Sequence, residues 1–434
     1  RELQQFVNEC TAQLSINVAS AGAPWDVTTL MTALKRLGFD LRPNGLIVMP
    51  DGDTGVLFSL LTSGAPPAAT TGLLTLLLDA LKARWPGLQS EGIGGPRMQA
   101  RGFRALWSSD KLSFLGFLDV LMHYREIIGI RRQLQAHLLA QRPDVFIGVD
   151  APDFNLDLER DLKAQGIPTI HFACPSIWAW RADRVEKIRQ SVDHVLCIFP
   201  FETDLLAQHG IDATYVGHPL AKNIPDLPDR AAARTALGLP QDATVVALLP
   251  GSRSSEIDYL AHRFLQAAQR MAKQQPGLHF VLPAMPALRA RIEAIAKDVG
   301  EVPNLLVLNG QSHAALAACD VTLIASGTAT LEAALFKRPM VIAYNMNWLS
   351  WQIMRRKKLQ PWVGLPNILC QDFVVPELLQ DAATPDALAH EVLQWLANPA
   401  AAAAVQQRFA TLHDTLRRDT PALAAHAIEK VLAR

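Results

Sequence analysis

Short apolar segments alternate with helical patterns along the chain from about residue 56 onward. Segments that are apolar throughout are typical of parallel strands, because helices cover both of their faces. The predicted strands are Val56–Leu61, Val145–Val149, Thr169–Ala173, His194–Phe199, Thr214–Val216, Thr244–Leu249, His279–Leu282, Leu305–Leu308, Val321–Ala325 and Met340–Tyr344. Helical periodicity is visible in Gly72–Arg84, Ile127–Ala140, Leu260–Lys273, Pro286–Lys297 and Ala329–Leu335. This alternation predicts an α/β fold with two doubly wound parallel-sheet domains.

The pattern divides the chain into residues 1–65, 66–222 and 223–434. We expect the boundary between the two sheet-containing domains in Gly217–Asp229, where three prolines break both periodicities. From Pro385 the sequence is alanine-rich and favours helices. These final helices are expected to pack back on the fold or to exchange in a dimer.

Composition excludes several classes of protein. The 434 residues are 50% hydrophobic and 19% charged, and 41 Lys and Arg balance 41 Asp and Glu, which suits neither a disordered chain nor a nucleic-acid-binding one. The five cysteines are scattered without a CxxC pair, so we expect no disulfide framework, no structural zinc and a reducing cytosol. No apolar run approaches the ~18–20 residues of a membrane span, and no secretory leader is recognisable at the start.

Two carboxylates follow the predicted strand Val145–Val149. Ligands of open α/β sheets bind beyond the carboxyl ends of the strands, so Asp150 and Asp153 are expected to face the crevice. Asp-Pro sequences are also common turn formers, and a purely structural turn is the alternative.

Two glycine-containing turns in the second domain suggest a nucleotide diphosphate site. Gly251, Ser252 and Arg253 separate a strand from a helix, and Ser326, Gly327 and Thr328 do the same further on, with Glu332 one turn into the helix. Backbone N–H groups at helix starts bind phosphate, arginine adds a guanidinium, and the carboxylate is placed to reach ribose hydroxyls. The alternative is ordinary helix capping. The chain has neither the GxGxxG nor the GxxxxGK[ST] fingerprint.

An aromatic and basic cluster, Trp178, Trp180 and Arg181, lies in "PSIWAWR". It marks either an acceptor pocket at the edge of the first domain or ordinary core packing.

Several motifs together resemble one family. "EGIGGPRMQARGF", "PDVFIGVDAPDFN", "PSIWAWR", "LLPGSRSSEI", "ASGTATLEAAL" and "LPNIL" occur in the order and spacing of the bacterial lipid A disaccharide synthases, over about residues 66–434. The resemblance implies an inverting GT-B glycosyltransferase without a cofactor or bound metal. It would join UDP-2,3-diacylglucosamine to 2,3-diacylglucosamine 1-phosphate, releasing UDP and the β-1′,6-linked disaccharide 1-phosphate.

The resemblance also assigns roles to individual residues. Asp153 would be the general base, with Asp150 as second choice, and His218 would lie in the cleft with Trp178, Trp180 and Arg181. The UDP site would comprise Gly251, Ser252, Arg253, Ser326, Gly327, Thr328, Glu332 and Asn367. The expected partners are lipid-linked sugars, the cytoplasmic face of the inner membrane and a possible second copy of the chain, but not nucleic acid.

Lipid substrates require an apolar surface near the acceptor pocket. One candidate is the apolar run that contains Phe114, Phe117, Leu118 and Leu121. A second is the basic stretch Arg355, Arg356, Lys357 and Lys358, suited to anionic headgroups. Buried core for the first stretch, and a solvated helix or a subunit contact for the second, are the alternatives.

The sequence departs from the family at one loop. Where the family carries "GEASGD", this chain has Pro66, Pro67, Ala68, Ala69, Thr70 and Thr71, and proline removes backbone N–H groups. A rival hypothesis is therefore a catalytically impaired chain, and a third is another UDP-sugar enzyme of the same fold.

Residues 1–65 follow a different, α+β pattern. It comprises helices at Glu2–Gln13 and Val27–Leu37, a strand at Leu14–Ala19 and two extended runs around an Asp-Gly turn. The segment is weakly similar to the first half of the C-terminal domain of ZipA, which binds a division-ring protein. In the rival hypothesis it is a protein-binding module.

Overall fold

The computed structural model describes residues 40–41, 47–48, 67–108, 117–179, 184–357 and 359–434. The chain divides into two compact units, residues 1–63 and 64–434. In the first unit, β1 (Asp40–Leu41) pairs antiparallel with β2 (Ile47–Val48). The other elements predicted before residue 66 lie outside the described residues.

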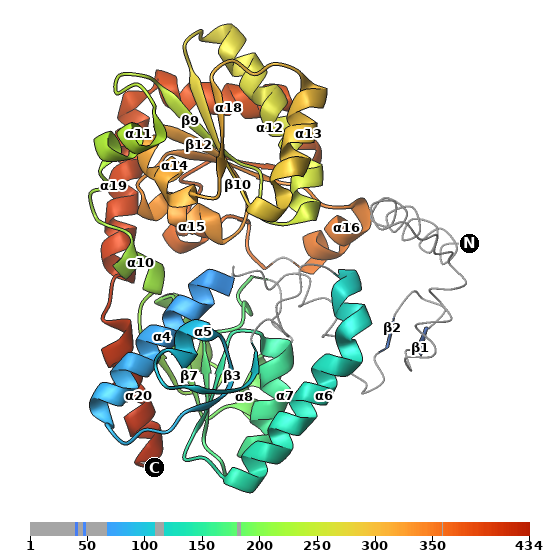
Figure 1. The fold of residues 1–434 in the computed structure, drawn as a ribbon, viewed down its shortest axis with the longest axis vertical. Helices are drawn as coiled ribbons and strands as arrows, with labels where there is room; N and C mark the ends of the chain where they lie inside the picture. The colour runs from blue at the N-terminus through green and yellow to red at the C-terminus, as the bar shows by residue number, and fades with distance from the viewer. Residues whose placement is uncertain (1–39, 42–46, 49–66, 109–116, 180–183, 358) are drawn as a thin grey trace. The chain divides into compact units, whose positions relative to one another are not determined.

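A six-stranded parallel sheet forms the centre of the later half of the second unit (Figure 1). Its strands are β9 (Val245–Leu249), β10 (His279–Ala284), β11 (Leu305–Asn309), β12 (Val321–Ala325), β13 (Met340–Tyr344) and β14 (Glu377–Leu379). They are ordered β11-β10-β9-β12-β13-β14, so the chain winds outward in one direction and then, from β12, in the other. The carboxyl ends of the neighbouring strands β9 and β12 therefore form the switch point at which such sheets bind ligands.

Side chains that alternate along the central strand fill two hydrophobic cores. Val246 and Leu248 of β9 pack with α12 (Ser254–Gln274) and α18 (Pro385–Ala397), while Val245 and Ala247 face α14 (Ser312–Ala318), α15 (Thr328–Leu335) and α19 (Pro399–Leu416). Both faces are covered, which explains why the strand contains no polar residue.

The earlier half of the second unit holds a four-stranded parallel sheet in sequential order. Its strands are β5 (Phe146–Val149), β6 (Thr169–Phe172), β7 (His194–Cys197) and β8 (Ala213–Tyr215). A separate parallel pair is made by β3 (Glu91–Gly94) and β4 (Arg104–Ser108). The helices here are α4 (Pro67–Arg84), α5 (Pro96–Gln99), α6 (Phe117–Gln141), α7 (Pro152–Lys163), α8 (Val185–Ser191), α9 (Phe201–Ala207) and α10 (Pro219–Asn223).

The last helix of the chain returns to this earlier half. Figure 1 shows α20 (Thr420–Leu432) beside α4, and its buried residue Ile428 packs with Phe172 and Leu196 of the four-stranded sheet. Residues 420–432 therefore share a core with the first sheet rather than with the second.

The parallel-sheet α/β architecture predicted from the sequence is confirmed, and each described strand predicted there lies within two residues of its observed limits. The pattern missed β3, β4 and β14. The remaining helices are α11 (Arg230–Leu237), α13 (Arg289–Val299), α16 (Trp348–Lys357) and α17 (Leu365–Cys370), with short 3₁₀ turns at Pro286–Leu288 and Gln380–Ala382. Within the described residues, no helix has the length and apolarity needed to cross a bilayer.

Candidate active site

The two candidate carboxylates, Asp150 and Asp153, lie in and directly after a strained turn between β5 and α7. Asp150 and Ala151 have φ angles of 52° and 44°, a region that side-chain-bearing residues rarely adopt. The amide of Asn155 donates a 2.8 Å hydrogen bond to the carbonyl of Asp150, which fixes the turn. Pro152 then begins α7 and places Asp153 in its first turn.

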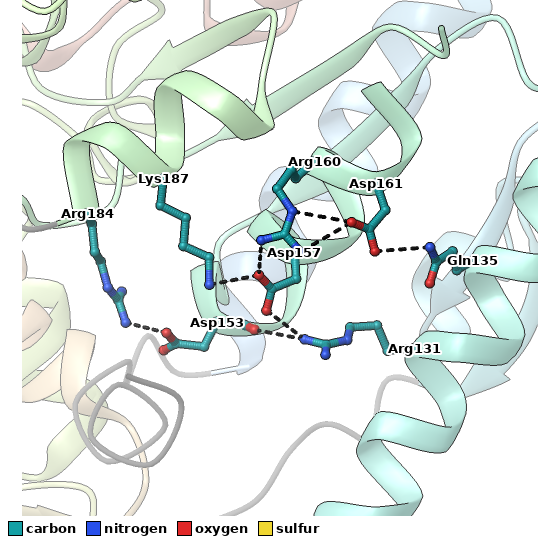
Figure 2. Close-up of polar contacts among 8 residues, drawn as sticks. All are labelled: Arg131, Gln135, Asp153, Asp157, Arg160, Asp161, Arg184 and Lys187. Atoms are coloured by element: carbon teal, nitrogen blue, oxygen red, sulfur yellow. Dashed lines mark hydrogen bonds and ion pairs between the residues drawn. The ribbon is translucent and has the colours of Figure 1, made fainter. Parts of the chain in front are cut away.

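Asp153 is buried and paired with a cation that the sequence analysis did not single out. Arg184, at the N-cap of α8, donates through Nη2 to Asp153 Oδ1, and the side chains of the pair are 6% and 9% exposed (Figure 2). One turn further along α7, Asp157 Oδ2 accepts a 3.0 Å hydrogen bond from Arg131, and Lys187 Nζ lies 2.9 Å from Oδ1. The base candidate thus belongs to a network of ion pairs that joins α6, α7 and α8.

A second buried pair lies behind the same turn. His171 Nδ1 on β6 is 2.8 Å from Glu159 Oε1 on α7, and neither side chain is exposed to solvent. Burial raises the pKa of Glu159. Burial alone would lower the pKa of His171, but the charge and the hydrogen bond of Glu159 together outweigh this effect, so the pKa of the imidazole is raised as well. A side chain at Gly148 would overlap the Glu159 carboxylate, so the pair requires glycine on β5.

The first predicted nucleotide turn follows β9 and caps its own helix. Gly251 has a φ of 130°, and a Cβ atom there would collide with Glu256. Glu256 Oε2 accepts hydrogen bonds from the backbone N–H of Ser252 at 2.8 Å and of Arg253 at 3.2 Å. Two N–H groups expected to face an anion therefore bind this carboxylate instead, and Arg253 Nη1 lies 3.3 Å from its other oxygen.

The second predicted turn follows β12, the strand that pairs with β9. Gly327 caps α15, and Ser326 Oγ donates to the carbonyl of Val363 at 3.3 Å. Glu332 lies one turn into α15 with its side chain 12% exposed, 3.5 Å from His313 Nε2. Because β9 and β12 are paired, the two turns that follow them are neighbours at the switch point, where a ligand could contact both.

Asn367 was predicted to bind nucleotide but is hydrogen-bonded within the chain. Its Oδ1 accepts from the backbone N–H of Val374 and Val375, and its Nδ2 donates to the carbonyl of Val375 and to Glu377 Oε1 at 2.8 Å. The residue is fully buried, so in this structure it shapes the loop before β14.

Comparison with known proteins identifies the family. Residues 68–428 match the family model described as Lipid-A-disaccharide synthetase. Lipid-A-disaccharide synthases from Albidiferax ferrireducens and Verminephrobacter eiseniae are 68% and 59% identical to this chain, in each case over 83% of the chain and 94% of the relative. The chain belongs to the lipid-A-disaccharide synthetase family.

Solved structures agree with this assignment at the level of fold. The glycotransferase of kitacinnamycin has a TM-score of 0.56 at 19% identity and covers 84% of this chain and 97% of that one. A UDP-GlcNAc 2-epimerase from Neisseria meningitidis also has a TM-score of 0.56, at 13% identity, covering 85% and 98% of the two chains. The family resemblance and the GT-B fold predicted from the sequence are confirmed.

Residues 66–71, where the sequence analysis expects a departure from the family, are helical where they are described. From Pro67 onward these residues form the start of α4, and Pro66 lies outside the described residues. The match to the synthetase family model begins one residue later, at Ala68.

The aromatic residues predicted at the acceptor pocket form a buried cluster in the family member. Trp178 is 9% exposed, meets Phe199 and Phe201 edge-on, and donates through Nε1 to Glu202 Oε1 at 3.0 Å. His218 stacks on Phe199, and burial lowers its pKa to about 4. Trp180 and Arg181 lie outside the described residues.

Of the predicted membrane-facing residues, Arg355 and Arg356 are exposed on α16, the helix that begins with the 68% exposed Trp348. Phe117, Leu118 and Leu121 lie on the first turns of α6, where only the backbone is described. The side chain of Lys357 is not described, and Phe114 and Lys358 lie outside the described residues. In the described part of the chain, no three His, Cys, Asp or Glu side chains are arranged to hold a metal ion.

The buried Glu202 predicts a pH-dependent stability. Burial raises its pKa to about 8, so the folded protein holds a proton that the unfolded chain releases near its ordinary value of 4.5. The free energy of unfolding should therefore fall as the pH rises from about 4.5 to about 8, and level off above that. We expect a loss of roughly 2 to 3 kcal/mol between pH 6 and pH 9, measured by urea unfolding. Glu202→Gln should remove most of this loss and the exposed control Glu293→Gln should not; equal losses in all three proteins would contradict the assignment.

Proposed function

We propose that the chain is an inverting, UDP-dependent glycosyltransferase that forms the lipid A disaccharide 1-phosphate. Its donor is UDP-2,3-diacylglucosamine and its acceptor is 2,3-diacylglucosamine 1-phosphate. The observation that carries the proposal is the identity of 68% with a lipid-A-disaccharide synthase of which the chain covers 94%. The two polar turns at the switch point supply a place for the nucleotide.

In the proposed reaction, Asp153 is the general base. Its carboxylate takes the proton of the acceptor 6-hydroxyl while that oxygen forms a bond to C1 of the donor sugar. The bond between C1 and the diphosphate oxygen breaks on the opposite face, and UDP leaves with the electron pair. Attack from the face opposite UDP inverts the anomeric centre and gives the β linkage.

The UDP group is proposed to bind at the carboxyl ends of β9 and β12. Arg253 lies in the turn that follows β9, and its side chain is 31% exposed, so it is accessible to a diphosphate. Phosphate can compete with Glu256 for the N–H groups of Ser252 and Arg253, because both are anions that suit a helix start. Glu332 is placed on α15 to meet the ribose hydroxyls.

We further propose that the protein binds the membrane surface peripherally through α16. Trp348, Arg355 and Arg356 are exposed on this helix, and exposed tryptophan together with arginine favours the interface of anionic lipids. The apolar run around Phe114 and Phe117 is proposed as a second contact.

The reaction is tested by measuring UDP release with both lipids and with each lipid alone. We expect release only when donor and acceptor are present together, with one disaccharide formed per UDP. Release from the donor alone, accompanied by epimerised sugar, would support a different UDP-sugar enzyme. No release under any condition would support the impaired chain, which the altered sequence at residues 66–71 motivates.

Asp153→Asn should lower kcat by roughly 10²–10⁴, because loss of a general base costs about that much. UDP affinity, measured by calorimetry, should stay within a few-fold of the unchanged protein. Asp161→Asn is the matched control, since Asp161 lies on the same helix, is 38% exposed and is paired with Arg160. Near-normal turnover of the Asp153 variant would assign the base to Asp150 or to another residue.

Replacing Trp348, Arg355 and Arg356 with Ser should weaken co-sedimentation with vesicles that contain anionic lipid, by roughly tenfold or more, since each basic residue contributes about 1 kcal/mol. The matched control replaces Leu227, Lys273 and Lys297 with Ser. These residues are also exposed, and their replacement removes the same number of positive charges. Equal binding of the two variants would show that α16 is not the contact.

A further inference from the structure

The chemistry of the acceptor restricts where its phosphate can bind. This argument rests on the proposed function. In 2,3-diacylglucosamine 1-phosphate the phosphate is on C1, and the reacting hydroxyl is on the carbon attached to C5. C1 and C5 are both bonded to the ring oxygen, so the phosphate and the nucleophile lie on neighbouring parts of one sugar ring. A cation that binds the phosphate must therefore lie close to the general base.

Among the described residues, four cationic side chains contact the aspartates of α7, and three of them pair with Asp157 or Asp161. Arg131 and Lys187 bind Asp157, and Arg160 lies beside Asp157 and Asp161 (Figure 2). Arg184 contacts Asp153 itself, through Nη2. A guanidinium has five N–H donors, and the hydrogen bond of Arg184 that the described residues show uses one of them.

Among the described residues, Asp153 is the one carboxylate that Arg184 contacts (Figure 2). Arg184 is only 6% exposed, and a buried charge of this kind is stable only when it is paired. A phosphate on its remaining donors would give it a second charged partner.

We propose that Arg184 binds the phosphate monoester of the acceptor while it keeps its contact with Asp153. One guanidinium then fixes the base and the acceptor relative to each other, which places the 6-hydroxyl against the carboxylate. The phosphate is thereby the feature by which the enzyme selects its acceptor over a sugar that lacks it.

The test compares two acceptors, 2,3-diacylglucosamine 1-phosphate and the same lipid without its phosphate. With the unchanged protein we expect kcat/KM to favour the phosphorylated acceptor. Arg184→Gln should reduce this preference by on the order of 10- to 100-fold, the range expected for charge-assisted hydrogen bonds. Most of the loss should fall on the phosphorylated acceptor, and UDP affinity should be unchanged.

Two further variants separate binding from stability. Arg189→Gln is the matched control, because Arg189 lies on the same helix, is 54% exposed and pairs with Glu186; it should keep the full preference. Arg184→Lys keeps the charge and should restore part of the preference, and it serves as the test if Arg184→Gln fails to fold.

A preference that Arg184→Gln leaves unchanged would overturn the proposal. An equal loss of kcat/KM with both acceptors, together with a lower Tm, would also overturn it, because that result is expected of a purely structural ion pair. Absence of turnover in the unchanged protein would instead count against the proposed function. Equilibrium binding of glucosamine 1-phosphate and of glucosamine to the unchanged protein and to Arg184→Gln then tests the phosphate contact independently of turnover.

Discussion

The order of strands in the six-stranded sheet is the constraint on which the rest of the site depends. Because β10 and β12 both lie beside β9, the connections from β9 and β12 leave toward opposite edges of the sheet. The carboxyl ends of these two strands are thus left next to each other without a crossover above them. The two polar turns that follow the strands meet there although they are separated by more than seventy residues of sequence. The local sequence determines which polar groups each turn carries, but the order of the strands brings the two turns together.

In the earlier half of the unit, the position of Asp153 depends on buried ion pairs rather than on the order of the strands. The helix that carries Asp153 is joined to α8 through Arg184 and to β6 through the pair of Glu159 and His171. Burying charged groups in this way is costly, and the cost is offset only while every partner is present. Such a network holds a carboxylate in one orientation, which a general base requires. It also explains why β5 carries glycine at position 148, where a larger side chain would displace Glu159.

The fold could be predicted largely from the sequence, because apolar strands covered on both faces leave a pattern that the residues alone reveal. The strands that were missed lack this pattern: β3 contains two glycines, and β4 and β14 have side chains that are exposed or half-buried. At the candidate site, Asp153 and the two polar turns could be selected from the sequence because they follow the carboxyl ends of predicted strands. Arg184, His171 and Glu256 were not found, since their roles depend on partners from other elements or on a capping geometry. Asn367 and Trp178 were assigned to the site, although the structure shows them hydrogen-bonded or packed within the fold.

The central claim is that the nucleotide binds at the carboxyl ends of β9 and β12, and a crystal structure with bound UDP tests it most directly. The diphosphate should lie between the turn at Gly251–Arg253 and the turn at Ser326–Thr328. The carboxylate of Glu256 should have moved away from the N–H groups of Ser252 and Arg253. UDP bound at any other place in the fold, with Glu256 still on those N–H groups, would contradict the account.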